Sequence, residues 1–367
     1  MRRISLFKRL DRWYLSHERR LTSLALIGGF VVDNFTLDRI DLWFENLIIF
    51  SYILVAGLGI FVINLCENQV LTGRFFKGLS RWLPLFVQFA FGGLFSAFII
   101  FYSRSASLTS SLLFVSVFAI LLIGNEFFRK YYTRLGFQMT LFFVGVFSFM
   151  IFFLPVLFGK MGPWMFIFSG IVSLIFIKIF SSLLYVYVPG RVRRSRKTFW
   201  PSILVIFIVI NTLYFTNFIP PIPLSLKDAG VYHNVEKISG GNYLTKKENR
   251  SLNDILHFKN TFHLLEYQPV YLYSSVFAPS KLNINIFHQW QYQNPSNNIW
   301  ITADSMSFPI GGGRDGGYRG YSVKQNVFEG SWRVNIITEH DQLLGRVNFE
   351  VIKSNQSESL KFKEEIK

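Results

Sequence analysis

Seven apolar runs, each bounded by polar or charged residues, occupy the first 218 positions of the chain. Apolar runs of about 20 residues with few charges are typical of transmembrane helices. The first run is the weakest, because it is short and carries Asp33 and Asn34; a cleavable signal peptide is its alternative, although no small-residue cleavage site follows. The pattern predicts a polytopic α-helical membrane domain with about seven spans, at 21–37, 47–65, 82–101, 108–124, 135–158, 163–184 and 200–218.

The pattern changes to alternation near the C-terminus. From Leu282 to Tyr292, apolar and aromatic residues take every second position, and the positions between them are mostly Asn and Gln, with Phe287 as the exception. Similar alternation covers 270–277, 332–336 and 347–351, the last two flanking the polar turn 339–342. A period of two is typical of half-buried strands, and two strands joined by a short polar turn form a hairpin. We therefore expect an all-β, immunoglobulin-like antiparallel sandwich.

These two patterns predict the domain organisation. We expect a basic cytoplasmic tail over 1–20, the transmembrane helical domain over 21–218, a linker over 219–250, the extracytoplasmic β-sandwich over 251–353 and a disordered tail over 354–367. The linker begins with three closely spaced prolines, Pro220, Pro221 and Pro223, which favour a stiff, extended exit from the bilayer. The tail lacks an apolar face, as disordered segments do. Residues 225–355 should fold as an autonomous antiparallel domain.

Basic residues are concentrated in the membrane half. The formal net charge is +16, of which +14 belongs to residues 1–218 and +2 to residues 219–367. The N-terminal tail and the second, fourth and sixth loops hold 18 Lys and Arg residues, whereas the alternate loops hold 3. This asymmetry follows the positive-inside rule and predicts a cytoplasmic N-terminus, so that an odd number of spans places residues 219–367 on the outer side. The lipid bilayer explains the basicity, and no nucleic-acid partner is expected.

The glycine-rich segment Gly311–Gly317 is the first candidate binding element. It lacks the Lys-Ser/Thr pair of a P-loop, and no helical pattern follows it. One interpretation is a long hairpin connection whose glycines take positive φ. The other is an anion-binding loop in which free backbone N–H groups act together with Arg314 and Arg319.

Aromatic and basic residues on the neighbouring strands are the second candidate. His288 and Trp290 share one strand face, so they either pack in the sandwich core or form an aromatic platform for a sugar ring. On the second interpretation, Tyr318 and Tyr321 contribute to the platform. The complete candidate binding set is His288, Trp290, Arg314, Tyr318, Arg319, Tyr321 and Arg333.

Few residues suggest catalysis, a metal or a cofactor. We assign no catalytic residue and expect no metal and no cofactor, and the sequence favours a protein without enzymatic activity over an enzyme. Five of the six histidines lie beyond residue 219, but no pair has metal-ligand spacing with a supporting carboxylate or thiolate. The GxSxG and HExxH motifs are absent, and the single cysteine, Cys66, allows no disulfide within the chain. Asp33, Glu45 and Lys178 lie in or beside the spans. They have an intramembrane role or are hydrated near an interface, Lys178 by extending towards the sixth loop.

The C-terminal motifs resemble a known family. The order FHQWQY, GGGRDGGYRGYS and GSWRVNIITEHDQLLGRVNFEV is similar to the bacterial DUF2914 family of unknown function, and PPIPLSLKDAGVYHNVEK resembles its membrane-anchored members. The resemblance covers roughly Ile219 to Val351. It implies a bacterial inner-membrane protein with a periplasmic β-rich domain, and no established activity comes with it. The matching positions are His288, Trp290, Gly313, Arg314, Tyr318, Arg319, Tyr321, Trp332, Arg333, Gly345 and Arg346.

Three classes of function are compatible with these observations. The first is a membrane-tethered binding or assembly module for an envelope protein or a glycan, which the sequence favours. The second is a polytopic enzyme acting on lipid-linked or cell-wall glycans, with acids such as Asp304 and Asp315. The third is a transport component, for which a repeated pair of interrupted helices would be expected and is not evident in the sequence.

Overall fold

The structure, a computed structural model, divides into two compact units, one mainly helical and one containing all the strands. It describes residues 30–31, 33–35, 37, 43–80, 82–105, 108–127, 131, 133–219, 221, 223–248, 260–265, 268–279, 282–311, 317–354 and 362–367. The predicted basic tail, most of the first predicted span and Arg314 therefore lie outside the described residues.

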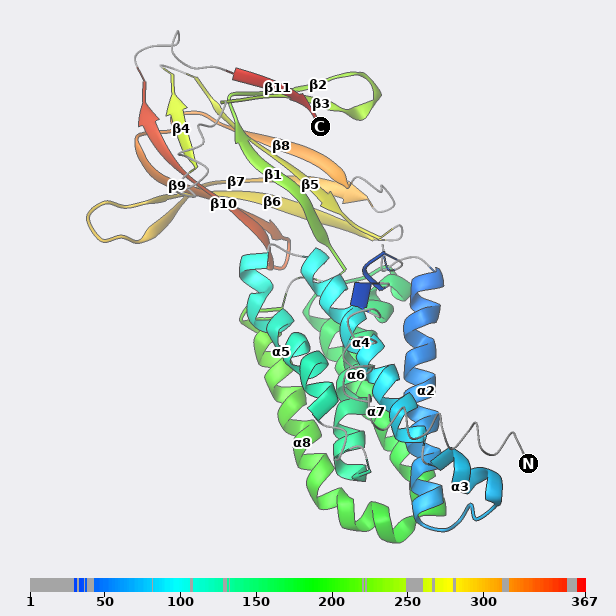
Figure 1. Ribbon diagram of the computed structural model, residues 1–367. Helices are drawn as coiled ribbons and strands as arrows, with labels where there is room; N and C mark the ends of the chain where they lie inside the picture. Colours follow the sequence, from blue (N-terminus) through cyan, green and yellow to red (C-terminus); the bar gives the residue numbers. More distant parts are fainter. Residues whose placement is uncertain are drawn as a thin grey trace. The chain divides into compact units, whose positions relative to one another are not determined.

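The helical unit is built from long apolar helices (Figure 1). In the described part of the chain, five of them are long and apolar enough to cross a membrane, and each overlaps one predicted span. A further helix covers the predicted fourth span and holds a shorter apolar stretch, Val115–Gly124. The seven-span count stays a prediction. The helices are α2 (Trp43–Glu67), α3 (Arg74–Ser80), α4 (Leu83–Ser105), α5 (Leu108–Phe127), α6 (Leu135–Phe158), α7 (Pro163–Tyr187) and α8 (Pro189–Phe215).

Aromatic packing and a polar contact hold these helices together. Tyr102 of α4 contacts Phe152 of α6 edge-on, with ring centroids 4.7 Å apart. Asn64 Nδ2 of α2 donates a hydrogen bond to Gln138 Oε1 of α6 at 2.7 Å, the kind of polar contact that joins helices where no water is present.

Two acidic side chains of the helical unit are buried. The sequence left open whether Asp33 and Glu45 are hydrated near an interface or have an intramembrane role, and their exposed fractions are 6% and 5%. This burial favours the second alternative.

The strands form three sheets (Figure 1). The first is antiparallel and has the order β1 (Ser225–Tyr232), β5 (Val270–Phe277), β8 (Tyr318–Lys324). The second has the order β4 (Thr261–Leu264), β10 (Leu343–Lys353), β9 (Gly330–Thr338), β6 (Asn283–Gln293), β7 (Trp300–Gly311), and it is mixed because β4 runs parallel to β10. The third is β11 (Phe362–Ile366), β3 (Tyr243–Glu248), β2 (Asn234–Lys237).

Two predicted boundaries are corrected by these pairings. The segment 219–250, expected to be a linker, contains β1, β2 and β3, and β1 pairs with β5. The segment 354–367, expected to be disordered, ends in β11, which pairs with β3. β1 and β11 form their hydrogen bonds with strands that are distant in sequence, and local composition does not reveal such partners. The region is all-β with a mixed sheet, and its relation to the immunoglobulin sandwich stays a prediction.

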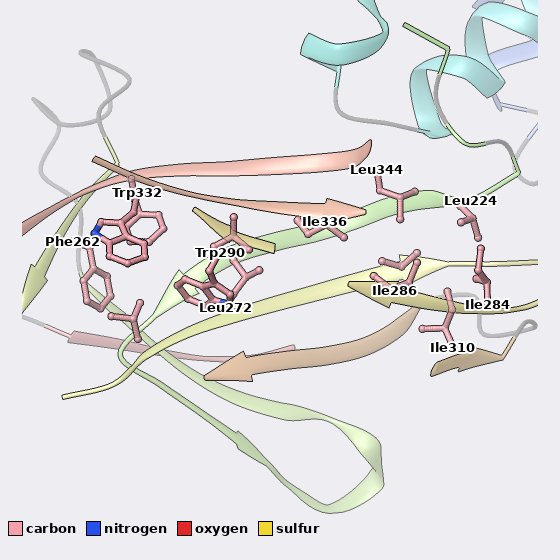
Figure 2. Close-up of a cluster of buried hydrophobic side chains, with 14 of the residues drawn as sticks. Leu224, Phe262, Leu272, Ile284, Ile286, Trp290, Ile310, Trp332, Ile336 and Leu344 are labelled. Atoms are coloured by element: carbon pink, nitrogen blue, oxygen red, sulfur yellow. The ribbon is translucent and has the colours of Figure 1, made fainter. Parts of the chain in front are cut away.

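One apolar core is shared by the first two sheets (Figure 2). The alternation in β6 places Ile284, Ile286 and Trp290 on one face, and that in β9 does the same for Trp332 and Ile336. Side chains of β5 complete the cluster from the three-stranded sheet. The inner face of the five-stranded sheet is therefore fixed by burial of apolar area, which leaves its other face for polar residues.

Candidate functional site

Polar side chains line up across the outer face of the five-stranded sheet. Gln291 of β6 lies opposite Arg333 of β9, and Gln289 lies opposite Asn335. Asn335 in turn lies opposite Arg346 of β10. Because residues paired across neighbouring strands share a face, these five side chains gather on the side away from the core. We call Gln289, Gln291, Arg333, Asn335 and Arg346 the polar ladder.

Hydrogen bonds connect every member of the polar ladder. Gln291 Oε1 accepts from Arg333 Nε at 2.7 Å and from Asn335 Nδ2 at 3.1 Å. Asn335 Nδ2 also donates to Gln289 Oε1 at 3.0 Å, and Asn335 Oδ1 accepts from Arg346 Nε at 2.6 Å. Each arginine thus uses its Nε within the ladder. In the described part of the chain, no residue accepts a hydrogen bond from the terminal nitrogens of either guanidinium.

The two guanidinium groups form a local concentration of positive charge. Burial lowers the pKa of Arg333 and of Arg346, and the neighbouring charge of Arg346 lowers the pKa of Arg333 further. Arginine nevertheless stays protonated in proteins, so both side chains remain charged. No carboxylate of the described residues forms an ion pair with either one. An anion bound between them would relieve the repulsion.

A hollow of about 650 Å³ lies beside the polar ladder, and its lining combines residues of this face with Trp332 and Phe349, whose side chains belong to the core. Arg333 and Arg346 line it together with Trp300 of β7, Asn348 and Glu350. The guanidinium carbon of Arg333 lies 4.2 Å from the centre of the Trp300 ring, a cation–π contact that fixes the plane of the guanidinium. The volume is within the range of small-ligand sites, and the lining combines an aromatic ring with convergent polar groups.

His288 and Trp290 lie in the core, which is the packing alternative of the sequence analysis. Neither side chain is exposed. The His288 ring nitrogens pair with Ser274 Oγ at 2.8 Å and Ser322 Oγ at 2.9 Å, and Trp290 Nε1 donates to Ser322 Oγ at 3.0 Å. Burial lowers the pKa of His288 to about 3, so the imidazole is neutral at ordinary pH. A sugar ring has no access to either side chain.

Arg319 lies in a different part of the strand unit. Arg319 Nη1 donates to Asn242 Oδ1 at 2.6 Å and to the Gly241 carbonyl at 3.4 Å, so this guanidinium holds the turn between β2 and β3. Arg314 and the rest of 312–316 lie outside the described residues. At the end of the segment, Gly317 has φ +80°, and a Cβ there would lie 2.7 Å from Ser275 Oγ. This position requires glycine. The expectation of a hairpin connection is wrong, because β7 and β8, which flank the segment, belong to different sheets and pair with β6 and β5 respectively.

The two candidate tyrosines are also separate from the polar ladder. Tyr318 is half-buried and packs against the apolar core. Tyr321 is 40% exposed, and its ring lies 5.9 Å from that of Tyr243 and 6.2 Å from that of Tyr271. Of the six predicted binding residues that the structure describes, only Arg333 lines the hollow. Arg346, Trp300 and the amides of the ladder were not in the predicted set, although their polar positions in alternating strands were visible.

Two further groups bear on possible chemistry. Asp304, suggested as a catalytic acid, forms an ion pair with Lys324 at 3.2 Å. Glu248 accepts from ring nitrogens of His233 and His263, both at 2.7 Å, and these hydrogen bonds outweigh burial and lower the pKa of Glu248. The described residues contain no group of three or more His, Cys, Asp or Glu side chains that could hold a metal ion. Glu248 of β3 therefore connects two other segments by hydrogen bonds: His263 of β4, and His233 between β1 and β2.

Comparison with known proteins gives a family match over part of the strand unit but no activity. No curated protein matches this chain. Among solved structures, Pseudomonas fluorescens alkylpurine DNA glycosylase AlkC, bound to DNA containing an abasic site analog, has 9% sequence identity and a TM-score of 0.18. That alignment covers 85% of this chain and 99% of the glycosylase, and a likeness this weak supports no inference. A family model does match, over strands β6 to β10. Residues 283–351, which include the whole polar ladder, match the family described as a protein of unknown function, DUF2914.

Proposed function

We propose that this protein is a multi-pass bacterial inner-membrane protein whose β region is a periplasmic binding module for an acidic envelope glycan. The anionic group, a carboxylate or phosphate, binds in the hollow beside the polar ladder. The proposal keeps seven spans and a cytoplasmic N-terminus. Its support is the 18-to-3 asymmetry of basic residues between alternate loops and the five apolar helices of membrane-spanning length in the described part of the chain.

The observation that carries the binding proposal is the way the two arginines are held. Both donate Nε to amide oxygens of the ladder, at 2.7 Å and 2.6 Å, so the guanidinium planes are fixed before any ligand arrives. Groups fixed in this way lose little side-chain entropy on binding. Their terminal N–H groups suit bidentate contacts with carboxylate or phosphate. Trp300 provides an aromatic surface at the edge of the same hollow, where a sugar ring can stack.

A titration of the purified full-length protein tests the binding site. Trigalacturonate is the acidic probe and maltotriose the neutral one, with binding followed by calorimetry. Replacing both Arg333 and Arg346 by Gln should weaken trigalacturonate binding by about tenfold or more, because hydrogen bonds to charged groups contribute about 1.5–3 kcal/mol each. The matched control replaces Lys237 and Lys353 by Gln; these two residues do not line the hollow.

The outcomes separate a specific site from general charge. Equal weakening in the control pair would mean that net charge, and not the hollow, attracts the probe. Equal affinity for maltotriose would exclude an anion site. Membrane orientation is tested independently, with a reporter active only outside the cytoplasm. The reporter should be active when fused after Lys367 and silent after Arg134, and the reverse at either position would contradict the proposed topology.

A further inference from the structure

A second hollow, of about 540 Å³, lies between α7 and α8 in the helical unit. Three basic side chains line it, Lys178 from α7 and Arg193 and Arg196 from α8. Ser181, Ser182 and Trp200 form part of the same wall. The sequence analysis identified Lys178 as an unexplained charge within a span, and the structure now places it beside two arginines of the basic segment that precedes the last apolar run.

Helical spacing accounts for this convergence. On α7, Lys178, Ser181 and Ser182 stand at positions i, i+3 and i+4, which share one face of a helix. On α8, Arg193 and Arg196 are three residues apart and Trp200 follows one turn later, so they share a face as well. Because α7 ends at Tyr187 and α8 begins at Pro189, the hollow lies close to the connection between the two helices.

The hollow is basic without any compensating acid. None of its lining residues is Asp or Glu, and the ion pairs of the described residues include neither Lys178 nor the two arginines. By contrast, Arg191 at the start of α8 pairs with Glu67. Three positive charges around one hollow repel one another unless an anion is present.

The surroundings of Lys178 are apolar. Ile175 and Ile179 on the same helix are 51% and 65% exposed, and exposed apolar side chains of a membrane-spanning helix face acyl chains. A lysine on such a surface is costly unless its ammonium group reaches a charged or hydrated partner. Tyr185 and Trp200, which also line the hollow, are residue types that concentrate at the level of lipid headgroups.

We propose that this hollow binds the phosphate group of an anionic membrane phospholipid. Lys178, Arg193 and Arg196 neutralise the phosphate, and the hydroxyl groups of Ser181 and Ser182 donate hydrogen bonds to its oxygens. The acyl chains lie along the exposed apolar surface of α7. A free phosphate ion has the same chemistry, but the apolar surface beside Lys178 favours a phosphate that carries acyl chains. The inference is independent of the proposed glycan site, which belongs to the strand unit.

Native mass spectrometry of the delipidated full-length protein in detergent tests this site. The protein is titrated with phosphatidylglycerol or phosphatidylcholine, and bound lipids are counted. Phosphatidylglycerol should bind more tightly. Replacing Arg193 and Arg196 by Gln should weaken its binding by about thirtyfold, since each basic residue near an anionic lipid contributes a factor of about five. Lys178→Gln should weaken binding by about fivefold.

The matched control replaces Arg194 and Lys197 by Gln, which removes the same charge from the same helix. Arg194 faces a different hollow and Lys197 lines neither, so this pair should change phosphatidylglycerol binding by less than about twofold. Equal loss in both pairs, or equal binding of the two lipids by the unsubstituted protein, would overturn the proposal. Inorganic phosphate is the remaining arm: if it displaces phosphatidylglycerol at equal concentration, the site takes free phosphate and the lipid assignment is wrong.

Discussion

The two faces of the five-stranded sheet use the same kinds of residue for opposite purposes. On the inner face, Trp332 and His288 are buried, and each polar nitrogen has a partner: Trp332 Nε1 donates to the Phe328 carbonyl at 2.8 Å. On the outer face, Arg333 and Trp300 meet at a hollow, and the arginine keeps terminal donors that no described residue engages. On the inner face, the polar nitrogens of Trp332 and His288 all form hydrogen bonds within the protein. On the outer face, Arg333 forms a hydrogen bond through Nε, which orients its guanidinium, and its terminal nitrogens form none with the described residues.

The number of hydrogen bonds that a polar group makes within the protein decides whether it serves mainly stability or is available to a ligand. A buried polar group must be hydrogen-bonded, because leaving it unpaired costs free energy. A group held by one nitrogen and open at the others contributes little to stability but is ready for a ligand. Aromatic or basic residue type alone therefore does not distinguish the proposed binding site from the core, whereas the number of hydrogen-bonded donors does. Three substitutions and one change of pH test whether the two faces of the sheet differ in this way. In each case, amide hydrogen exchange of the full-length protein measures the stability of the strands.

Replacing Trp332 by Ala should have the largest effect. The side chain is 1% exposed and shares the core with Trp290, so its loss should destabilise the strand unit by about 3–5 kcal/mol. The outer-face control is Trp300→Ala, which should cost about 1 kcal/mol or less. Exchange rates of β6 and β9 amides report both values. Similar costs for the two tryptophans would show that the two faces are not energetically distinct.

Acidification should have the next largest effect, through His288. The pKa of this buried imidazole is about 3 in the folded protein, whereas an exposed histidine has a pKa of 6.5. The unfolded chain therefore binds a proton first, and stability present above pH 6.5 falls progressively as the pH decreases towards 3. Between about pH 7.5 and pH 5 the loss should be about 2 kcal/mol.

The control for this pH effect is His288→Gln, which removes the titrating group. This variant should be less stable near neutral pH, because Ser274 and Ser322 lose their partner geometry, but its stability should change less between the same two pH values. If the variant and the unsubstituted protein show the same pH slope, another group causes the loss.

Replacing Gln291 by Leu should have an intermediate effect. Gln291 is 9% exposed and its Oε1 accepts from both Arg333 and Asn335, so the change leaves two donors without their acceptor. A loss of about 1–2 kcal/mol is expected, together with weaker trigalacturonate binding as Arg333 becomes free to rotate. Gln293→Leu on the same strand is the control for stability alone, since Gln293 also lines the hollow and its amide makes one long hydrogen bond, at 3.4 Å to the Asn298 carbonyl. Equal losses of stability at both positions would remove the special role of the ladder.

Arg333→Lys should have the smallest effect on stability, less than about 1 kcal/mol, because the side chain is at the surface and its contact with Trp300 is a cation–π interaction. The substitution keeps the charge. Lysine, however, has no planar guanidinium, which in Arg333 donates Nε to Gln291 while its two terminal nitrogens point outwards. Trigalacturonate binding should therefore fall several-fold while strand protection stays the same. Unchanged binding would show that charge alone recruits the ligand.

The sequence by itself determined the strands that alternate most clearly and the apolar helices. Strands β5, β6, β9 and β10 lie where the period of two predicted them, and the predicted hairpin at 339–342 is confirmed by the pairing of β9 with β10. The pattern also determined which side chains of β6 face the core, because residues at every second position of a strand share a face. The resemblance to DUF2914 is confirmed over residues 283–351.

Only the tertiary structure decided the remaining strands and the site. β1 and β11 obtain their hydrogen bonds from partners distant in sequence, as β11 does from β3 across more than 100 residues, and β2 pairs locally with β3. The hollow likewise needs Arg333 of β9, Arg346 of β10 and Trp300 of β7 on one face at matching register. Alternation along one strand fixes the face of each residue but not its neighbour on the next strand. Cross-strand register, which sets those neighbours, results from packing the whole core.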